Sequence, residues 1–298
     1  MDLNKLLIFI SLCGITIIWC LGWFFTKLGL SYSSPFSFTT ARFVIASIIM
    51  VVALPFLSKN KLPSREFWLP IAAVGFLQTA LMFVLSAYGL VLIDLSRATI
   101  LIYTTPLWSV LLGPIFLKEE LNTSRILCVI LGCIGIGLII LPSIDNAPLL
   151  GYLLLMTSSF CWAISILVAK RYLSKADQLH VLVWQTVVGT FGLILFGFFI
   201  DEEINFTFNF NSISALIYVS VFGTIVAAMY LWFFIIQRVE MIQASLASLA
   251  VPIFVMLINS IFLDGNIDVG LILRSLLIIL SILVVLLQPQ NAVKNIKE

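Results

Sequence analysis

The chain alternates between long apolar stretches and short polar or proline-containing stretches over its whole length. A membrane-spanning helix needs about 20 consecutive apolar residues, and ten stretches reach that length. They cover about residues 6–29, 36–57, 67–91, 96–117, 124–142, 149–170, 180–200, 212–236, 242–263 and 268–288. The runs are continuous and do not alternate as membrane strands do. Since a helix satisfies its own backbone hydrogen bonds in lipid, the pattern predicts an all-α integral membrane protein with ten transmembrane helices.

The composition supports a lipid environment for the whole chain. Of the 298 residues, 62% are hydrophobic and only 10% are charged, against about 25% charged residues in soluble domains. The first apolar run is too long for the core of a signal peptide. The five cysteines all lie inside apolar runs, which argues against a disulfide framework or a zinc site. We expect no metal and no cofactor, and the absence of a basic stripe argues against nucleic acid as a partner.

The positions of the basic residues predict the orientation in the membrane. Twelve of the sixteen lysines and arginines fall on one side if the ten spans are counted in order: Lys5, Lys59, Lys61, Arg65, Lys118, Arg125, Lys170, Arg171, Lys175, Arg238, Lys294 and Lys297. Cytoplasmic loops carry the excess of lysine and arginine. Both termini are therefore predicted to be cytoplasmic, with residues 291–298 as a cytoplasmic tail. Short loops and no organelle signal favour a bacterial inner membrane.

The two halves of the chain share a pattern at an offset of about 145 residues. Trp19 and Lys27 are eight residues apart in the first span, as are Trp162 and Lys170 in the sixth. Further matches keep the same order: Arg42 with Gln185, Gly75 with Gly223, Pro106 with Pro252, and Phe116-Leu117 with Phe262-Leu263. We predict one five-helix repeat in residues 1–142 and a second in 143–290. An odd number of spans per repeat inverts the second repeat, as in many transporters.

Several segments resemble a known family. They are Ile18-Trp19-Cys20-Leu21-Gly22, Thr40 to Ala46, Tyr103-Thr104-Thr105-Pro106-Leu107-Trp108, Phe116 to Leu121, and Cys161-Trp162-Ala163 to Lys170-Arg171. In this order and spacing, and over nearly the whole chain, the sequence resembles EamA-type members of the drug/metabolite transporter superfamily. The resemblance implies a ten-helix fold whose central cavity is lined by the first, third, fourth, sixth, eighth and ninth helices. It also implies export or exchange of amino acids or other small metabolites without ATP.

Polar and aromatic side chains inside the spans mark candidate substrate contacts, because polar groups in a membrane usually face protein or a wet cavity. Helical spacing places several of them on shared faces. The candidates for substrate binding are Trp19, Gln78, Tyr103, Trp108, Trp162, Ser245 and Ser248. Small and hydroxyl residues also serve as packing contacts between membrane helices, and that alternative stays open for each.

The charged residues and prolines within the spans each have two interpretations. Arg42 suits a substrate carboxylate because its guanidinium is a planar fork, but an anchoring role in the fold is favoured. Asp94 and Arg97 pair on one helix face or take part in gating or coupling. Glu119 belongs to a solvated helix end or to a cytoplasmic gate, and the second half, with Asp264-Gly265-Asn266, does not mirror it. Pro106 and Pro252 are hinges or static bends.

These features favour a secondary transporter of small metabolites that alternates access around a midplane cavity between the repeats. A channel and a polytopic membrane enzyme are the alternatives. The chain has no G-x-x-x-x-G-K-[ST], H-E-x-x-H or G-x-S-x-G motif, so neither ATP hydrolysis nor enzymatic catalysis is expected. The expected partners are a small-molecule substrate and the bilayer. A proton is one candidate coupling ion, and monomer and homodimer remain open.

Overall fold

A computed structural model describes residues 3–58, 62–118, 122–141, 148–199, 205–232, 241–262 and 269–286. The described part is built from helices. The α-helices are α1 Leu3–Gly29, α2 Pro35–Leu57, α3 Trp68–Val74, α4 Phe83–Leu92, α5 Leu95–Ile102, α6 Thr105–Leu117, α7 Thr123–Ile140, α8 Leu149–Tyr172, α9 Gln178–Gly197, α10 Phe210–Ile217, α12 Met241–Phe262 and α13 Val269–Leu286. A 3₁₀ turn, η1 (Arg65–Phe67), precedes α3, and two π-helical segments are η2 (Gly75–Met82) and η4 (Tyr218–Trp232).

All ten predicted stretches contain helix, and most boundaries agree to within about three residues. Seven helical stretches are long and apolar enough to cross a membrane: Ile10–Gly29, Pro35–Leu57, Arg65–Leu92, Leu95–Leu117, Thr123–Ile140, Leu149–Tyr172 and Gln178–Gly197. Three shorter apolar helices, at Phe210–Val226, Ala250–Phe262 and Val269–Leu283, occupy the last three predicted spans. The all-α membrane architecture is thereby confirmed, while the total of ten spans and the placement of the termini stay predictions.

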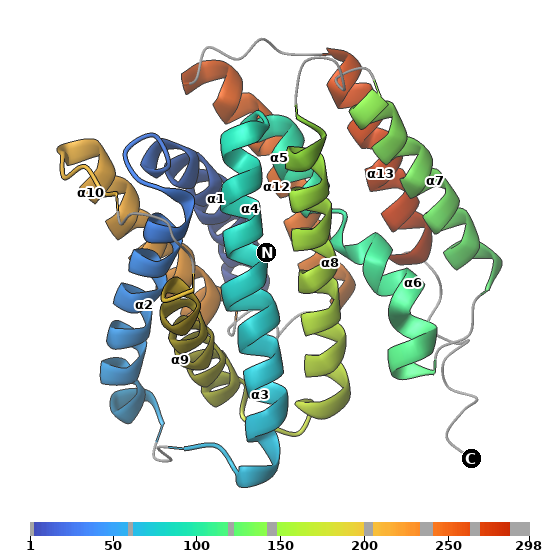
Figure 1. The fold of residues 1–298 in the computed structure, drawn as a ribbon. Coiled ribbons are helices and arrows are strands. Elements are labelled where there is room, and N and C mark those ends of the chain that lie inside the picture. Colours follow the sequence, from blue (N-terminus) through green and yellow to red (C-terminus); the bar gives the residue numbers. More distant parts are fainter. Residues whose placement is uncertain are drawn as a thin grey trace, which may run out of the picture.

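The helices form a bundle with one pair of helices at its edge (Figure 1). The antiparallel helices α7 and α13 pack against each other at one side of the molecule. Helix α6 contacts both α7 and α8. In the main bundle, α1 contacts α12 and η4, while α9 contacts α2 and η2. Segments from the two predicted repeats therefore pack across one another throughout the bundle.

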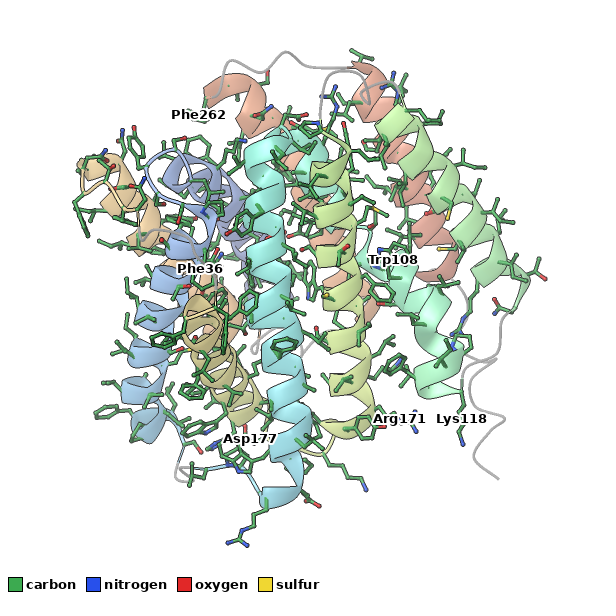
Figure 2. The ribbon with its side chains drawn as sticks, viewed as in Figure 1. Phe36, Trp108, Lys118, Arg171, Asp177 and Phe262 are labelled. Carbon is green, nitrogen blue, oxygen red and sulfur yellow. The ribbon has the colours of Figure 1, made fainter. Side chains whose placement is uncertain are left out.

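Charged groups gather at one end of this bundle. Lys118, Arg171 and Asp177 lie at the same end of the molecule, and Phe262 lies at the other (Figure 2). The Arg171 side chain donates a hydrogen bond of 2.6 Å to the backbone carbonyl of Phe116, near the C-terminus of α6. This placement agrees with the charge pattern that predicts a basic cytoplasmic side.

The fourth predicted span is broken and is not one continuous helix. Helix α5 ends at Ile102 and α6 begins at Thr105, with a turn at Tyr103 and Thr104 between them. Pro106 lies in the first turn of α6, where the missing N–H of a proline leaves no bond unmade. The break therefore interrupts the helical periodicity of this span between Ile102 and Thr105.

Two π-helical segments fall at equivalent places in the predicted repeats. Segment η2 begins at Gly75 in the third span, and η4 contains Gly223 in the eighth. These are the two glycines that the sequence comparison between halves pairs. Such segments are rare in proteins and occur frequently at functional sites.

The two halves meet at both segments, through the backbone at Gly75 and through a side chain at Gly223. A Cβ atom added at Gly75 would meet the backbone of Gln185 and would lie 3.1 Å from the amide nitrogen of Gly189 in α9. In the other half, a Cβ at Gly223 would lie 3.8 Å from Nη2 of Arg42 in α2. Gly75 of the first half thus lies beside Gln185 of the second half, and Gly223 of the second half lies beside Arg42 of the first. Arg42 and Gln185 are themselves a matched pair in the sequence comparison.

Candidate substrate cavity

A cavity of about 830 Å³, counted with its open mouth, lies where α1, α2, η2, α8, α9 and η4 converge. Its described lining comes from both halves of the chain: Trp19, Gly22, Trp23, Thr26, Arg42, Phe43, Gln78, Thr79, Met82, Phe83, Tyr103, Trp162, Leu182, Gln185, Thr186, Gly223 and Thr224. The wall is mostly aromatic and aliphatic, with a few hydroxyls, two carboxamides and one charge. A concave, largely apolar pocket with a small number of polar groups is typical of small-molecule sites.

Four of the predicted substrate residues line this cavity. Trp19 comes from α1, Gln78 from η2, Tyr103 from the α5–α6 break and Trp162 from α8. Tyr103 and Trp162 meet edge to face, with ring centroids 5.7 Å apart. The hydroxyl of Ser165 donates a hydrogen bond of 3.3 Å to Oε1 of Gln78. These contacts hold the aromatic and amide groups in place without filling the cavity.

Arg42 also reaches the cavity, and its surroundings contain no negative partner in the described part of the chain. Its side chain is buried, with 9% exposure. Its Nε and Nη2 donate long hydrogen bonds of 3.4 and 3.3 Å to Oγ1 of Thr224. The guanidinium lies 4.5 Å from the ring centroid of Phe83 and 5.0 Å from that of Phe43, within reach of a cation–π interaction.

Trp108 and the two prolines lie outside the cavity lining. The Trp108 ring packs edge to face on Phe160, 5.4 Å between centroids, and its Nε1 has no hydrogen-bond partner among the described residues. Pro252 is buried within α12 and lines a small second pocket that Tyr103 also borders. Pro106 lies in the first turn of α6, beside the helix break.

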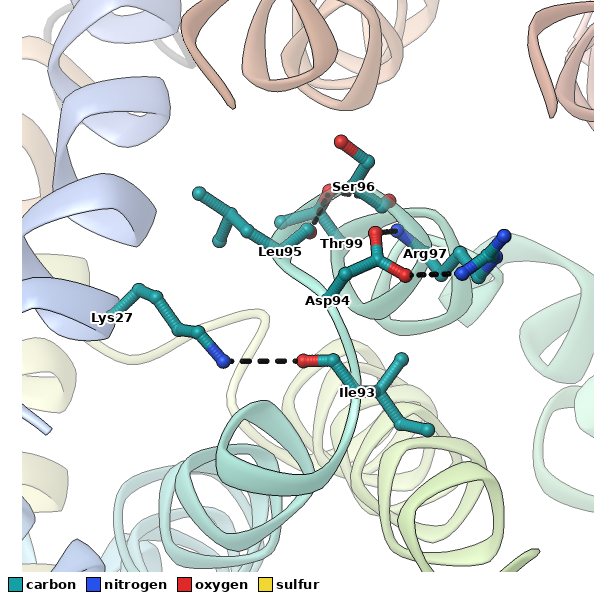
Figure 3. A network of polar contacts seen from close by, with 7 residues as sticks. All are labelled: Lys27, Ile93, Asp94, Leu95, Ser96, Arg97 and Thr99. Atoms are coloured by element: carbon teal, nitrogen blue, oxygen red, sulfur yellow. Dashed lines mark hydrogen bonds and ion pairs between the residues drawn. The ribbon is translucent and has the colours of Figure 1, made fainter. Parts of the chain in front are cut away.

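Asp94 and Arg97 form a local pair at the start of α5 (Figure 3). The Asp94 carboxylate accepts the Arg97 backbone N–H at 3.0 Å and an Arg97 guanidinium N–H at 2.8 Å. Asp94 is therefore the N-cap of α5, a position that favours aspartate. Both groups are about one-third exposed, which supports the structural interpretation of this pair.

Lys27 supplies a polar contact between spans close to this pair. Its ammonium donates to the carbonyl of Leu90 in the last turn of α4. It also donates, at 3.3 Å, to the carbonyl of Ile93, directly after α4 (Figure 3). Carbonyls at the end of a helix lack partners within it, and a cation there also complements the helix dipole. The contact joins the end of α1 to the end of α4.

Three predicted residues cannot be placed. Glu119 lies outside the described residues, and Ser245 and Ser248 lie in a stretch of α12 whose side chains the structure does not describe.

The sequence pattern did not single out several lining residues. Trp23, Phe43 and Phe83 could not be distinguished from the many other aromatic residues of the apolar runs, and Gln185 was identified only as the residue that matches Arg42.

The resemblance implied a cavity lined by six spans, which did not include the second or the seventh. The structure adds both, through Arg42 in α2 and Gln185 in α9, whereas the described side chains of α12 contribute none. The depth of Arg42 and Gln185 within their spans was the only signal in the sequence that these two residues contact the cavity.

Comparison with known families identifies this architecture. The sequence profile of the EamA-like transporter family matches residues 6–141 and again residues 149–287. The chain belongs to the EamA-like transporter family. As a member of this family, within the drug/metabolite transporter superfamily, it is a multi-pass membrane transporter.

Relatives of this EamA-like protein span nearly its whole length. The uncharacterized transporter YoaV of Bacillus subtilis is 22% identical over 91% of this chain and 94% of its own. An uncharacterized transporter of Archaeoglobus fulgidus is 27% identical over 90% of this chain and 94% of its own. A solved crystal structure superposes with a TM-score of 0.63 at 16% identity and covers 93% of this chain and 95% of its own. The likeness to that structure concerns the fold alone.

Proposed function

We propose that this protein is a secondary transporter that exports or exchanges small metabolites such as amino acids, and that it binds them in the cavity described above. The observation that carries the proposal is the convergence of Trp19, Gln78, Tyr103 and Trp162 on one cavity together with Arg42. Side chains from both halves of the chain form its wall. A site at the contact between two halves is the arrangement from which alternating access operates in transporters with inverted repeats.

The contacts between the halves suggest where the access change takes place. Segment η2 carries Gln78 and Thr79, and η4 carries Gly223 and Thr224, so both π-helical segments form part of the cavity wall. Segment η2 touches α9 of the opposite half at Gly75, and Gly223 of η4 lies beside the Arg42 side chain of α2. Rocking of one half against the other moves these two segments relative to α9 and α2. The cavity then opens to the other side of the membrane, while the same residues continue to line it.

Counterflow in liposomes tests the proposal. The purified protein is reconstituted, loaded with an unlabelled amino-acid or metabolite panel, and supplied with trace amounts of each labelled compound. We expect saturable exchange that other panel members compete for. Linear, non-competable flux would indicate a channel, and chemical conversion of the compound would indicate an enzyme. Flux driven outward or inward from loaded vesicles, with and without a proton gradient, determines direction and coupling.

Two tryptophan variants provide a matched test of the site. Trp162→Phe alters the cavity wall, whereas Trp108→Phe makes the same change outside it. We expect Trp162→Phe to raise the half-saturating substrate concentration and Trp108→Phe to leave it close to that of the wild type. The reverse order would move the site to the face that contains Trp108.

A further inference from the structure

Arg42 brings a charge into the wall of the cavity. Among the described lining residues it is the charged one, and no carboxylate accompanies it. The carboxylates that the structure describes, Glu66, Asp94 and Asp177, lie elsewhere, and the ion pair found among described residues joins Asp94 to Arg97. A buried guanidinium without a counterion is unfavourable, since a charge away from water needs a partner.

The hydrogen-bonding capacity of Arg42 is also incompletely used. A guanidinium carries five N–H donors, and in the described part of the chain Arg42 bonds only to the Thr224 hydroxyl, through Nε and Nη2. Nη1 makes no hydrogen bond with a described residue. Arg42 lines the cavity, so the cavity is the space in which its remaining donors can find a partner. An anion with two oxygens suits such a planar fork.

The rest of the lining is suited to an uncharged body. The rings of Trp19, Tyr103 and Trp162 line the cavity together with the side chain of Met82. In the described lining no acidic group is present to pair with a substrate ammonium. The aromatic faces and the carboxamides of Gln78 and Gln185 can accommodate an ammonium without requiring one.

We infer that the cavity recognises small organic acids with one carboxylate and an apolar body, with the carboxylate bound by Arg42 and the α-amino group dispensable. This inference rests on the proposed function and deepens it. It assigns Arg42 a substrate contact in place of the anchoring role that the sequence favoured. Amino acids satisfy it through their carboxylate, and so do their deaminated counterparts.

Binding to the purified full-length protein in detergent tests the inference, with calorimetric titration of three probes. Phenylalanine carries both groups, 3-phenylpropionate lacks the ammonium, and phenylalaninol lacks the carboxylate. We expect both carboxylates to bind and phenylalaninol to bind at least about tenfold more weakly, which corresponds to one charge-assisted interaction. Equal binding of phenylalaninol and phenylalanine, or no binding of either carboxylate, would overturn the inference.

A matched pair of variants at Thr224 separates recognition from folding. Thr224→Asp places a carboxylate beside the guanidinium that Thr224 already contacts, so the fold keeps a partner for Arg42 while the cavity loses its free cation. Thr224→Asn has the same size without the charge. We expect Thr224→Asp and Arg42→Gln to lose binding of both carboxylates by about tenfold or more, while Thr224→Asn keeps the wild-type order of the probes. Carboxylate binding by Thr224→Asp at wild-type strength would refute the role of Arg42.

The liposome assay distinguishes this failure from failure of the proposed function. Carboxylate binding without counterflow would refute transport and leave the recognition by Arg42 intact. Counterflow of other solutes without carboxylate binding would retain the transporter and overturn the inference.

Discussion

The crossing of η2 and α9 at Gly75 and Gly189 allows a quantitative test of how the cavity is built. A Cβ added at Gly189 would meet the backbone oxygen of Gly75 and would lie 2.5 Å from Cβ of Thr79 and 3.0 Å from the carbonyl carbon of Gly75. Carbon atoms are in favourable contact at about 3.5–4.0 Å. The obstacles are backbone atoms and a Cβ, which cannot rotate away, so the helices must separate by about 1 Å in Gly189→Ala.

The expected loss of stability is about 1–3 kcal/mol, which is typical of overpacking a close contact. Thermal denaturation in detergent, followed by the fraction of monodisperse protein after heating, measures it as a lower transition temperature. Separation of the helices also moves Thr79, Gln185 and Thr186 in the cavity wall. We therefore expect weaker substrate binding together with the lower transition temperature.

Gly192→Ala is the matched control, because Gly192 lies on the same helix and a Cβ there meets no atom within 4 Å. Alanine is also the better helix former, so this variant should melt no lower than the wild type. Equal transition temperatures for Gly189→Ala and Gly192→Ala would refute the argument that the two halves touch backbone to backbone at this crossing.

Three further substitutions test contacts that position the spans. Asp94→Ala should cost about 1 kcal/mol through loss of the α5 cap, whereas Asp94→Asn, which retains an accepting oxygen, should cost less; thermal melts compare them. Lys27→Met should destabilise the protein by about 1–3 kcal/mol, because the carbonyls of Leu90 and Ile93 lose their charged donor; an unchanged melt would contradict this. Ser165→Ala should weaken substrate binding modestly by releasing Gln78, and titration of the binding-competent ligand measures it.

Much of the fold was predictable because the membrane imposes strong constraints on sequence. A span must be apolar over a fixed length and must satisfy its own backbone, so the apolar runs located the helices, including α2 at Pro35–Leu57 and α8 at Leu149–Tyr172. The caps follow from local chemistry as well. The side chains of Asp94, Asn122 and Asp177 each accept a hydrogen bond from a backbone N–H in the first turn.

The candidate site was predictable only in part. Trp19, Gln78, Tyr103 and Trp162 were selected one helix at a time from polar and aromatic spacing, and the structure brings them to one cavity. Trp108 was selected in the same way, but the structure packs it against Phe160 of α8, outside the cavity lining. A proline near a helix end is compatible with a kink, a break or an ordinary first turn.

The amino-acid sequence by itself determined that the protein lies in a membrane and where its apolar helical stretches begin and end. These properties depend on local length, hydropathy and order, and neighbouring residues specify them. Only the tertiary structure decided that Arg42 faces Thr224 in the opposite half, that η2 and η4 are π-helical, and that Gln185 joins the cavity wall. Those properties depend on how helices more than a hundred residues apart cross and pack, which no local pattern specifies.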